Sequence, residues 1–207
     1  MLDLFAVLSL AQACAPSVAP ETLAAIAHVE SRFDSLAIGV NRGPGPGRRA
    51  RSADEASRMA RRLLARGANL DLGLAQINSD NLAWLGLSIE EAFDPCLSLA
   101  AAATVLRVGY RPTGPDLRAH QAALRAALSR YNSGHPQQGI RNGYVARIEA
   151  AAARLSLTSA ASSPPAPSQR PIRLVAEPPP PAWDVFARAR GEAALAFAPE
   201  PARSSQP

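Results

Sequence analysis

One carboxylate lies on the apolar face of a predicted helix. Between Pro20 and Phe33, apolar residues recur at helical spacing, and Glu30 falls in line with them. Burial raises the pKa of a carboxyl group, because the charged form loses hydration, and a carboxyl group that stays protonated near neutral pH can act as a general acid. The alternative is that Glu30 reaches solvent at the helix end or pairs with an arginine such as Arg32. The spacing alone leaves both interpretations open.

Three polar segments could meet this carboxylate. They read Gly-Leu-Ala-Gln-Ile-Asn over residues 73–78, Tyr-Asn-Ser-Gly over residues 131–134 and Asn-Gly-Tyr over residues 142–144. Their tyrosine, glutamine and asparagine side chains combine flat apolar faces with hydrogen-bonding tips, which suits sugar rings and acetamido groups. Each segment alone is also typical of a turn or a helix end. Their joint occurrence favours a carbohydrate site.

The elements that must position these segments are mainly helical, because Ala and Leu dominate and apolar residues recur at helical spacing. The glycine- and proline-rich run 43–47 cannot be helical. Ser52 with Glu55 and Ser88 with Glu91 have the capping-box spacing, and we expect a helix to begin at each pair. The expected helices cover residues 2–14, 20–33, 52–66, 96–108, 116–131 and 144–155, besides the one that begins at residue 88.

Composition limits the classes of function. The chain has 207 residues, 47% of them hydrophobic, and its 22 basic residues, all arginine, exceed its 17 acids, for a net charge of +5. No apolar stretch approaches the ~20 residues of a membrane span, which excludes a multi-span membrane protein. The apolar helix over 96–108 is too short for a span and is expected to lie buried at the centre of the domain. Two cysteines and three histidines argue against a structural zinc site, which takes about four such ligands. We therefore expect neither a metal ion nor an organic cofactor.

The composition changes near Leu155. Beyond it, more than half of the 19 prolines are mixed with Ala, Ser and Arg. Such a segment cannot bury enough apolar area to offset the entropy of ordering it. We expect a single domain over residues 1–155 and a flexible Ala/Pro/Ser-rich tail over residues 156–207.

Three blocks of this sequence resemble, in order, the three signature blocks of lytic transglycosylases with a soluble-lytic-transglycosylase, lysozyme-like domain. They are Glu30-Ser31, residues 73–78 and residues 131–134. The segments around them resemble the form carried by type IV secretion and conjugation systems; these segments are 14–20, 37–41 and 92–96. The resemblance covers residues 4–155. It implies a mainly α, lysozyme-like (α+β) fold.

The resemblance also implies an activity. The family cleaves the β-1,4 bond between N-acetylmuramic acid and N-acetylglucosamine in peptidoglycan without adding water, and leaves a 1,6-anhydro end. Glu30 matches the catalytic acid, which would first protonate the leaving oxygen and then deprotonate the muramoyl 6-hydroxyl. The residues expected to bind substrate are Ser31, Gln76, Asn78, Tyr131 and Asn132, to which the third polar segment adds Tyr144.

A second carboxylate would change the reaction. Ordinary glycosidases use two carboxylates, and Asp34 and Asp71 lie close to the signature blocks in sequence. We interpret Asp34 as a helix-end or turn residue and Asp71 as a turn former, which leaves Glu30 as the single catalytic carboxyl group. A hydrolytic muramidase with a second carboxylate is the alternative.

The two cysteines, Cys14 and Cys96, lie within the segments that resemble the secretion-associated form. A disulfide between them would tie the first helix to the core across a loop of about 80 residues and add about 4 kcal/mol of stability. Two unpaired buried thiols are the alternative.

The resemblance implies peptidoglycan glycan strands as substrate and a place in the periplasm or cell envelope, beside a secretion or conjugation channel that the tail could contact. A signal peptide is not evident, because Asp3 stands where positive charge is expected, although Ala11-Gln-Ala13 has a cleavable form. We favour a first helix that stays in the domain, and the export route is open.

The basic balance and the arginine-rich helix 52–66 raise nucleic-acid binding as a competing class. No DNA- or RNA-binding signature is recognisable, and such a helix is typically a solvated face, so we expect no nucleic-acid partner. Its positive face could instead attract stem-peptide carboxylates or an acidic partner. A docking protein that keeps the fold without catalysis is a third possibility.

Overall fold

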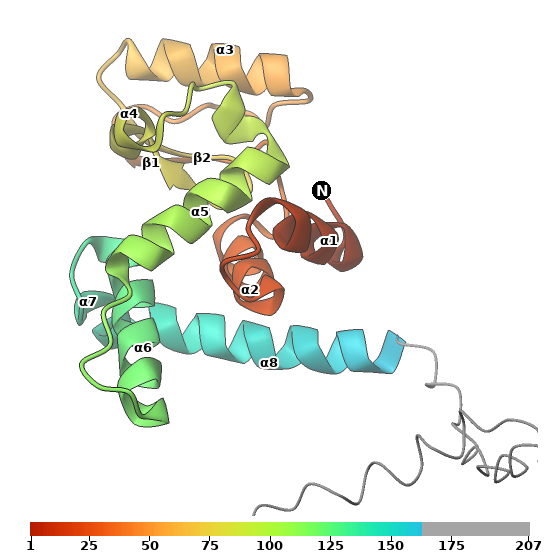
Figure 1. Cartoon of the computed structure of the whole chain (residues 1–207). Coiled ribbons are helices and arrows are strands. Elements are labelled where there is room, and N and C mark those ends of the chain that lie inside the picture. The colour runs from red at the N-terminus through yellow and green to blue at the C-terminus, as the bar shows by residue number, and fades with distance from the viewer. Residues whose placement is uncertain (163–207) are drawn as a thin grey trace, which may run out of the picture. The chain divides into compact units, whose positions relative to one another are not determined.

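The chain folds into a mainly helical domain with a small sheet toward one end, which confirms the predicted fold class (Figure 1). The structure is a computed structural model that describes residues 1–162. The α-helices are α1 (Leu4–Cys14), α2 (Pro20–Ser31), α3 (Ala53–Leu64), α4 (Leu82–Leu85), α5 (Pro95–Gly109), α6 (Leu117–Ser133), α7 (Gln138–Arg141) and α8 (Tyr144–Ser162). Two 3₁₀ turns, η1 (Ser79–Asn81) and η2 (Glu91–Phe93), join them. Residues 163–207, and with them most of the predicted tail and its expected channel contact, lie outside the described part.

Local chemistry explains where these helices begin. Pro20 and Pro95 occupy the first turns of α2 and α5, where a missing N–H costs nothing. The side chains of Ser52 and Asp116 accept hydrogen bonds from backbone N–H groups at the starts of α3 and α6, at 3.2 and 2.7 Å. Gly134 ends α6 in the left-handed conformation that glycine adopts most easily.

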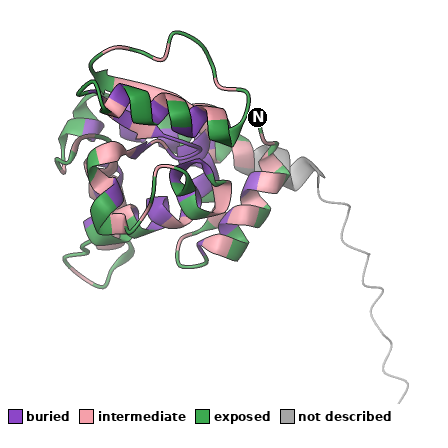
Figure 2. Ribbon diagram, turned by 90° about the horizontal axis from the view of Figure 1, so that it is seen from above, coloured by how far each residue is buried: buried purple, intermediate pink, exposed green. Residues whose placement is uncertain are grey.

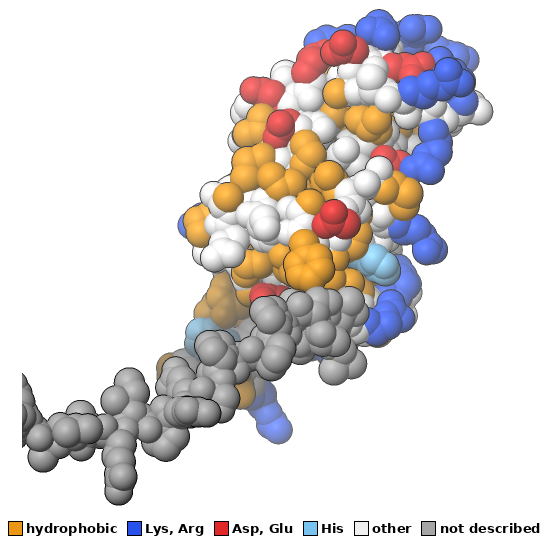
Figure 3. Space-filling model, turned by 90° about the vertical axis from the view of Figure 1, so that its right-hand side faces the viewer, with side chains coloured by type: hydrophobic (Ala, Val, Ile, Leu, Met, Phe, Trp, Pro, Cys, Tyr) orange, Lys and Arg blue, Asp and Glu red, His pale blue; other side chains and the backbone are white. Residues whose placement is uncertain are grey.

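The sheet has three short antiparallel strands in the order β1 (Ile38–Arg42), β2 (Asn69–Leu72) and β3 (Ile77–Asn78). The register between β1 and β2 shifts between Val40 and Arg42, which leaves Asn41 at an irregularity of the kind that re-aims a side chain. Helix α3 lies over this sheet (Figure 1). The arginine side chains gather over α3 and its neighbouring loop at the top of the molecule (Figure 3), so the solvated face expected for this helix is present.

Three expectations about helices need correction. Helix α2 ends at Ser31 rather than at Phe33, because Arg32 and Phe33 have φ angles of 54° and 66°. The capping box of Ser88 and Glu91 forms with reciprocal bonds of 2.8 and 3.2 Å, yet it opens only the 3₁₀ turn η2. Helix α5 is not buried all round, since Val108 keeps 56% of its surface exposed.

The core lies between α2 and the elements that surround it. Leu23 to Ala27 of α2 are buried, and so are Val7 and Ala11 of α1. In Figure 2 the buried residues, in purple, lie mainly toward the inside of the domain, and the exposed residues, in green, lie on its outer helices and loops. Helix α8 packs along α2, and α5 contacts both α1 and α6. None of the helices in residues 1–162 combines the length and apolar character needed to cross a membrane.

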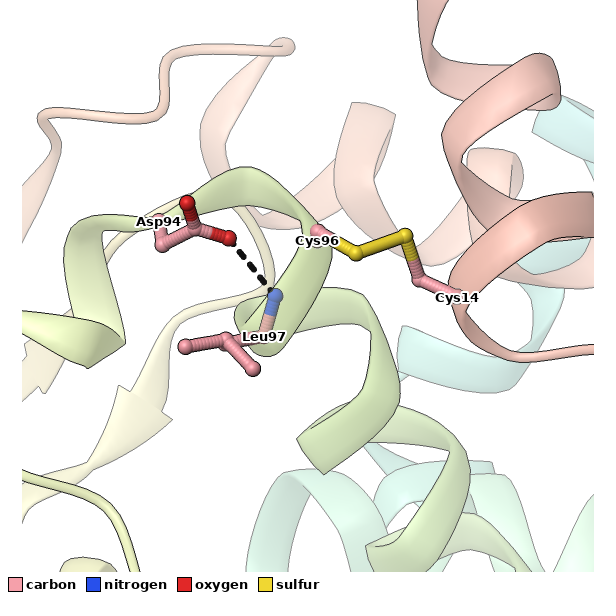
Figure 4. The surroundings of a disulfide bond; sticks show 4 residues. All are labelled: Cys14, Asp94, Cys96 and Leu97. Atoms are coloured by element: carbon pink, nitrogen blue, oxygen red, sulfur yellow. Dashed lines mark hydrogen bonds between the residues drawn. A yellow bond between two sulfur atoms is a disulfide. The ribbon is translucent and has the colours of Figure 1, made fainter.

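A disulfide joins Cys14 at the end of α1 to Cys96 at the start of α5 (Figure 4), which confirms the expected pair. The two Cα atoms are 5.5 Å apart and 82 positions apart in sequence. Beside it, the carboxylate of Asp94 accepts a hydrogen bond of 2.9 Å from the backbone N–H of Leu97 and caps α5. The bridge therefore fixes α1 to a well-capped helix start, across a loop that includes the sheet.

Candidate active site

A polar cavity of about 380 Å³ opens between the end of α2, the sheet and the end of α6. Five of the residues predicted to form the site line it: Glu30, Gln76, Asn78, Tyr131 and Asn132. The remaining lining residues are Asn41, Asp71, Ile77, Asn81, Val105, Arg130, Ser133 and Gly134. Two predicted substrate-binding residues, Ser31 and Tyr144, do not line the cavity and act behind it.

Glu30 is half-buried in the last turn of α2. Its Oε1 atom accepts a hydrogen bond of 2.5 Å from the hydroxyl of Tyr144. Burial raises the pKa of Glu30 to about 7, and the charge of Asp71 also raises it. The hydrogen bond from Tyr144 and the charge of Arg147 lower the pKa and offset part of this rise. None of the ion pairs among residues 1–162 includes Glu30. The side chain is therefore a sheltered carboxyl group that holds its proton near neutral pH.

Tyr144 connects Glu30 to the far side of the cavity. Tyr144 is 2% exposed, and burial raises the pKa of its hydroxyl well above the ordinary value, so Tyr144 is a neutral donor. Its backbone N–H donates to Oδ1 of Asn142 at 3.0 Å, and Nδ2 of Asn142 donates to Oδ1 of Asn132 at 2.9 Å. The residues at and just before the start of α8 thus orient two groups: the Tyr144 hydroxyl that binds Glu30, and the side-chain amide of Asn132.

The segment 73–78 is held by side chains from two helices and by a hydrogen bond within itself. The hydroxyl of Tyr131 donates to the carbonyl of Ala75 at 2.7 Å, and that of Ser31 donates to the carbonyl of Leu74 at 2.6 Å. The Nε2 atom of Gln76 donates to the carbonyl of Gly73 at 2.9 Å. Ser31 therefore fixes the loop to the helix of Glu30, and Tyr131 fixes it to α6.

Gly73 allows this segment to pass close to η2. Its φ is +73°, and a Cβ atom built at this position would lie 2.0 Å from the carbonyl oxygen of Ala92. Only glycine fits such a position.

A second carboxylate, that of Asp71, shares the cavity with Glu30. Its Oδ1 accepts a hydrogen bond from Nδ2 of Asn78 and its Oδ2 accepts one from Nδ2 of Asn41, both of 2.7 Å. Asn69 bridges the same two asparagines through its side chain. The interpretation of Asp71 as a turn former is wrong, because the residue lies in β2 and its side chain is held at the cavity by two amides.

Asp34 has the turn role that was expected of it. Its Oδ1 accepts a hydrogen bond of 3.1 Å from the backbone N–H of Leu36, two positions on, just beyond the end of α2. Its other oxygen pairs with Arg49, and the side chain does not line the cavity of Glu30.

Comparison with known proteins places these residues in a family. The profile of the transglycosylase SLT domain matches residues 8–151. The chain belongs to the transglycosylase SLT domain family. All the cavity-lining residues of this SLT domain, from Glu30 to Gly134, fall within the matched range. No solved structure matches the chain significantly.

Several curated relatives share the SLT domain. The chain is 42% identical over 176 residues to "Protein virB1" of Rhizobium radiobacter, covering 85% of this chain and 70% of the relative. It is 45% identical over 145 residues to "Protein virB1" of Agrobacterium fabrum, covering 70% and 58%. It is 42% identical over 151 residues to "Type IV secretion system protein virB1" of Brucella suis, covering 70% and 63%.

The residues predicted individually for the site do not include four polar residues that line the cavity of this SLT domain. Asn41 lies within β1 and Asn81 ends the turn η1, and Arg130 and Ser133 adjoin the predicted pair Tyr131 and Asn132. The position of Arg130 next to a signature block was a signal that could have been used. Asn41 ends the segment 37–41 that resembles the secretion-associated form, but its place at the cavity depends on the register shift in β1.

The cavity supplies one proton donor, one further carboxylate, one cation and several neutral amides and hydroxyls. Within residues 1–162, no group of three or more His, Cys, Asp and Glu side chains could hold a metal ion. The arrangement can protonate an oxygen atom of a bound polar ligand and hold that ligand by neutral hydrogen bonds.

Proposed function

We propose that this chain is a peptidoglycan lytic transglycosylase. The observation that carries the proposal is the carboxyl group of Glu30, whose pKa is about 7, in a cavity lined by amides and a tyrosine. Membership of the SLT family supports the substrate class, and the raised pKa supports the reaction type. Ser31 and Tyr144 act in this proposal as positioning residues, because neither lines the cavity.

The mechanism needs one carboxyl group that acts twice. Protonated Glu30 gives its proton to the glycosidic oxygen, the bond from C1 of N-acetylmuramic acid to that oxygen breaks, and the substrate's own acetamido group stabilises C1. The Glu30 carboxylate then takes the proton of the muramoyl 6-hydroxyl, whose oxygen bonds to C1. Glu30 ends protonated, no water is consumed, and a 1,6-anhydro ring is formed. Gln76, Asn78 and Asn132 are suited to bind hydroxyl and acetamido groups of the strand.

Hydrolysis is the second candidate, and Asp71 is the observation that favours it. Two carboxylates in one cavity are the usual equipment of a hydrolytic glycosidase, in which the second one stabilises or attacks C1 or activates water. Both oxygens of Asp71 already accept amide hydrogen bonds, which holds the side chain in place and leaves neither oxygen free of a protein partner.

Digestion of purified sacculi, with mass spectrometry of the fragments, tests both candidates. We expect wild type to release anhydromuropeptides and Glu30→Gln to release none while it keeps the wild-type circular dichroism spectrum. Products heavier by one water would identify a hydrolase instead. Asp71→Asn is expected to lower the rate yet leave anhydro products. Unchanged turnover by Glu30→Gln would refute the assignment of the acid.

The relatives suggest the setting of this activity. Proteins named virB1, several of them named as type IV secretion system proteins, are more than 40% identical to this chain. We infer that the chain opens peptidoglycan locally for such an apparatus in the cell envelope, where the Cys14–Cys96 disulfide would be stable. Loss of substrate transfer on deletion of the gene, restored by wild type but not by Glu30→Gln, is the expected result in cells.

A further inference from the structure

Arg130 is the one cation among the residues that line the cavity. It lies in the last turn of α6, directly before Tyr131, and its side chain is half-buried. One of its guanidinium nitrogens, Nη1, donates to the carbonyl of Gly109 at 3.1 Å, which helps to satisfy the end of α5. A guanidinium group has five N–H donors, so this bond uses only a small part of its capacity.

The acids of the cavity do not neutralise Arg130. It takes part in none of the ion pairs among the described residues. The charges that act on Glu30 are those of Asp71 and Arg147, and the oxygens of Asp71 are engaged by Asn41 and Asn78. A half-buried guanidinium group in a cleft is therefore available to an anion that the ligand brings.

The substrate class of the proposed function supplies such an anion. Peptidoglycan strands carry carboxylates on their stem peptides and, where the peptide has been removed, on the lactyl group of N-acetylmuramic acid. Guanidinium binds carboxylate through short, charge-assisted hydrogen bonds, often two at once. We propose that Arg130 binds a carboxylate of the glycan strand and thereby makes the cleft prefer muramic-acid-containing strands over neutral N-acetylglucosamine polymers. This inference rests on the proposed function, because it assumes that the cavity holds such a strand.

Binding measurements in the Glu30→Gln background test this without turnover. The probes are a tetrasaccharide that carries stem peptides, the same tetrasaccharide after amidase treatment, which leaves lactyl carboxylates, and the neutral tetramer of N-acetylglucosamine. We expect Arg130→Gln to weaken binding of a carboxylate-bearing probe about tenfold to a hundredfold, and binding of the neutral tetramer by less than about twofold. Loss confined to the first probe identifies the stem-peptide carboxylate as the source, loss confined to the second identifies the lactyl carboxylate, and loss on both shows that Arg130 binds either one.

Two further variants separate binding from structure. Arg130→Lys keeps the charge and is expected to recover part of the preference, which raised salt should weaken. Arg118→Gln removes an exposed charge from the first turn of the same helix and is the matched control, for which we expect no change. An equal loss on all three probes would show that Arg130 only supports α5 and would overturn the inference. Turnover of sacculi by Glu30→Gln would instead overturn the proposed function, so the two failures are distinguishable.

Discussion

Replacement of Glu30 by Gln is expected to change stability in a pH-dependent way. The pKa of Glu30 is about 7 in the folded protein and 4.5 as its ordinary value. Below pH 4.5 the group is protonated in both states and adds no pH dependence. As pH rises from 4.5 to 7, the unfolded chain loses its proton first, so folding stability falls. The shift of about 2.5 pH units corresponds to about 3 kcal/mol above pH 7. The side chain of Glu30→Gln does not titrate, so the stability of the variant lacks this dependence on pH.

Urea denaturation of wild type and Glu30→Gln at several pH values between 4 and 8 measures this quantity. All other titrating groups are shared, so they cancel in the difference between the two proteins. We expect the variant to gain about 3 kcal/mol relative to wild type between pH 4.5 and pH 8. Glu21→Gln removes an exposed carboxylate from the first turn of the same helix and is the control, which should not reproduce the gain. A difference that stays constant or falls with pH would refute the sheltered carboxyl group.

Three further predictions concern the support of the site. Tyr144→Phe removes a hydrogen bond that lowers the pKa of the proposed acid, so the alkaline fall of sacculus lysis should move up by about one pH unit in a pH–rate profile. Replacement of Cys14 and Cys96 by Ser should lower the free energy of unfolding by about 4 kcal/mol in urea titrations, from a loop of 82 residues. Gly73→Ala should cost at least about 2 kcal/mol in thermal unfolding, whereas Gly86→Ala, with open space around it, should cost about 1 kcal/mol.

The sequence predicted most helices because their signals are local. The proline at the start of α2 and the glycine after α6 act within a single turn, so the pattern of neighbouring residues suffices. The sheet gave no comparable signal, because its strands are two to five residues long. The capping box at Ser88 shows that a local signal can also mislead. The predicted pair of hydrogen bonds forms, but it begins only a 3₁₀ turn, and the next α-helix begins at Pro95.

The site was predictable where the signature blocks carry the lining residues themselves. Gln76, Asn78 and Tyr131 line the cavity, as expected from two of the three polar segments, whereas the third, residues 142–144, does not reach it. The role of Asp71 could not be read in the same way, because its partners Asn41 and Asn78 come from the two strands that flank it. Pairing between strands distant in sequence decides such contacts, and the spacing of residues along the chain does not report it.

Burial raises the pKa of Glu30 and the hydrogen bond from Tyr144 lowers it, and this balance suits one carboxyl group to both proton transfers of the proposed transglycosylation. Burial alone would raise its pKa further, which would give a good proton donor for the glycosidic oxygen but a carboxyl group slow to release that proton. The hydroxyl of Tyr144 stabilises the charged form, and a charged form is what must accept the proton of the 6-hydroxyl. A pKa near the operating pH is the value at which one group performs both transfers well. The buried tyrosine behind the cavity is therefore as much a part of the proposed chemistry as the amides that line it.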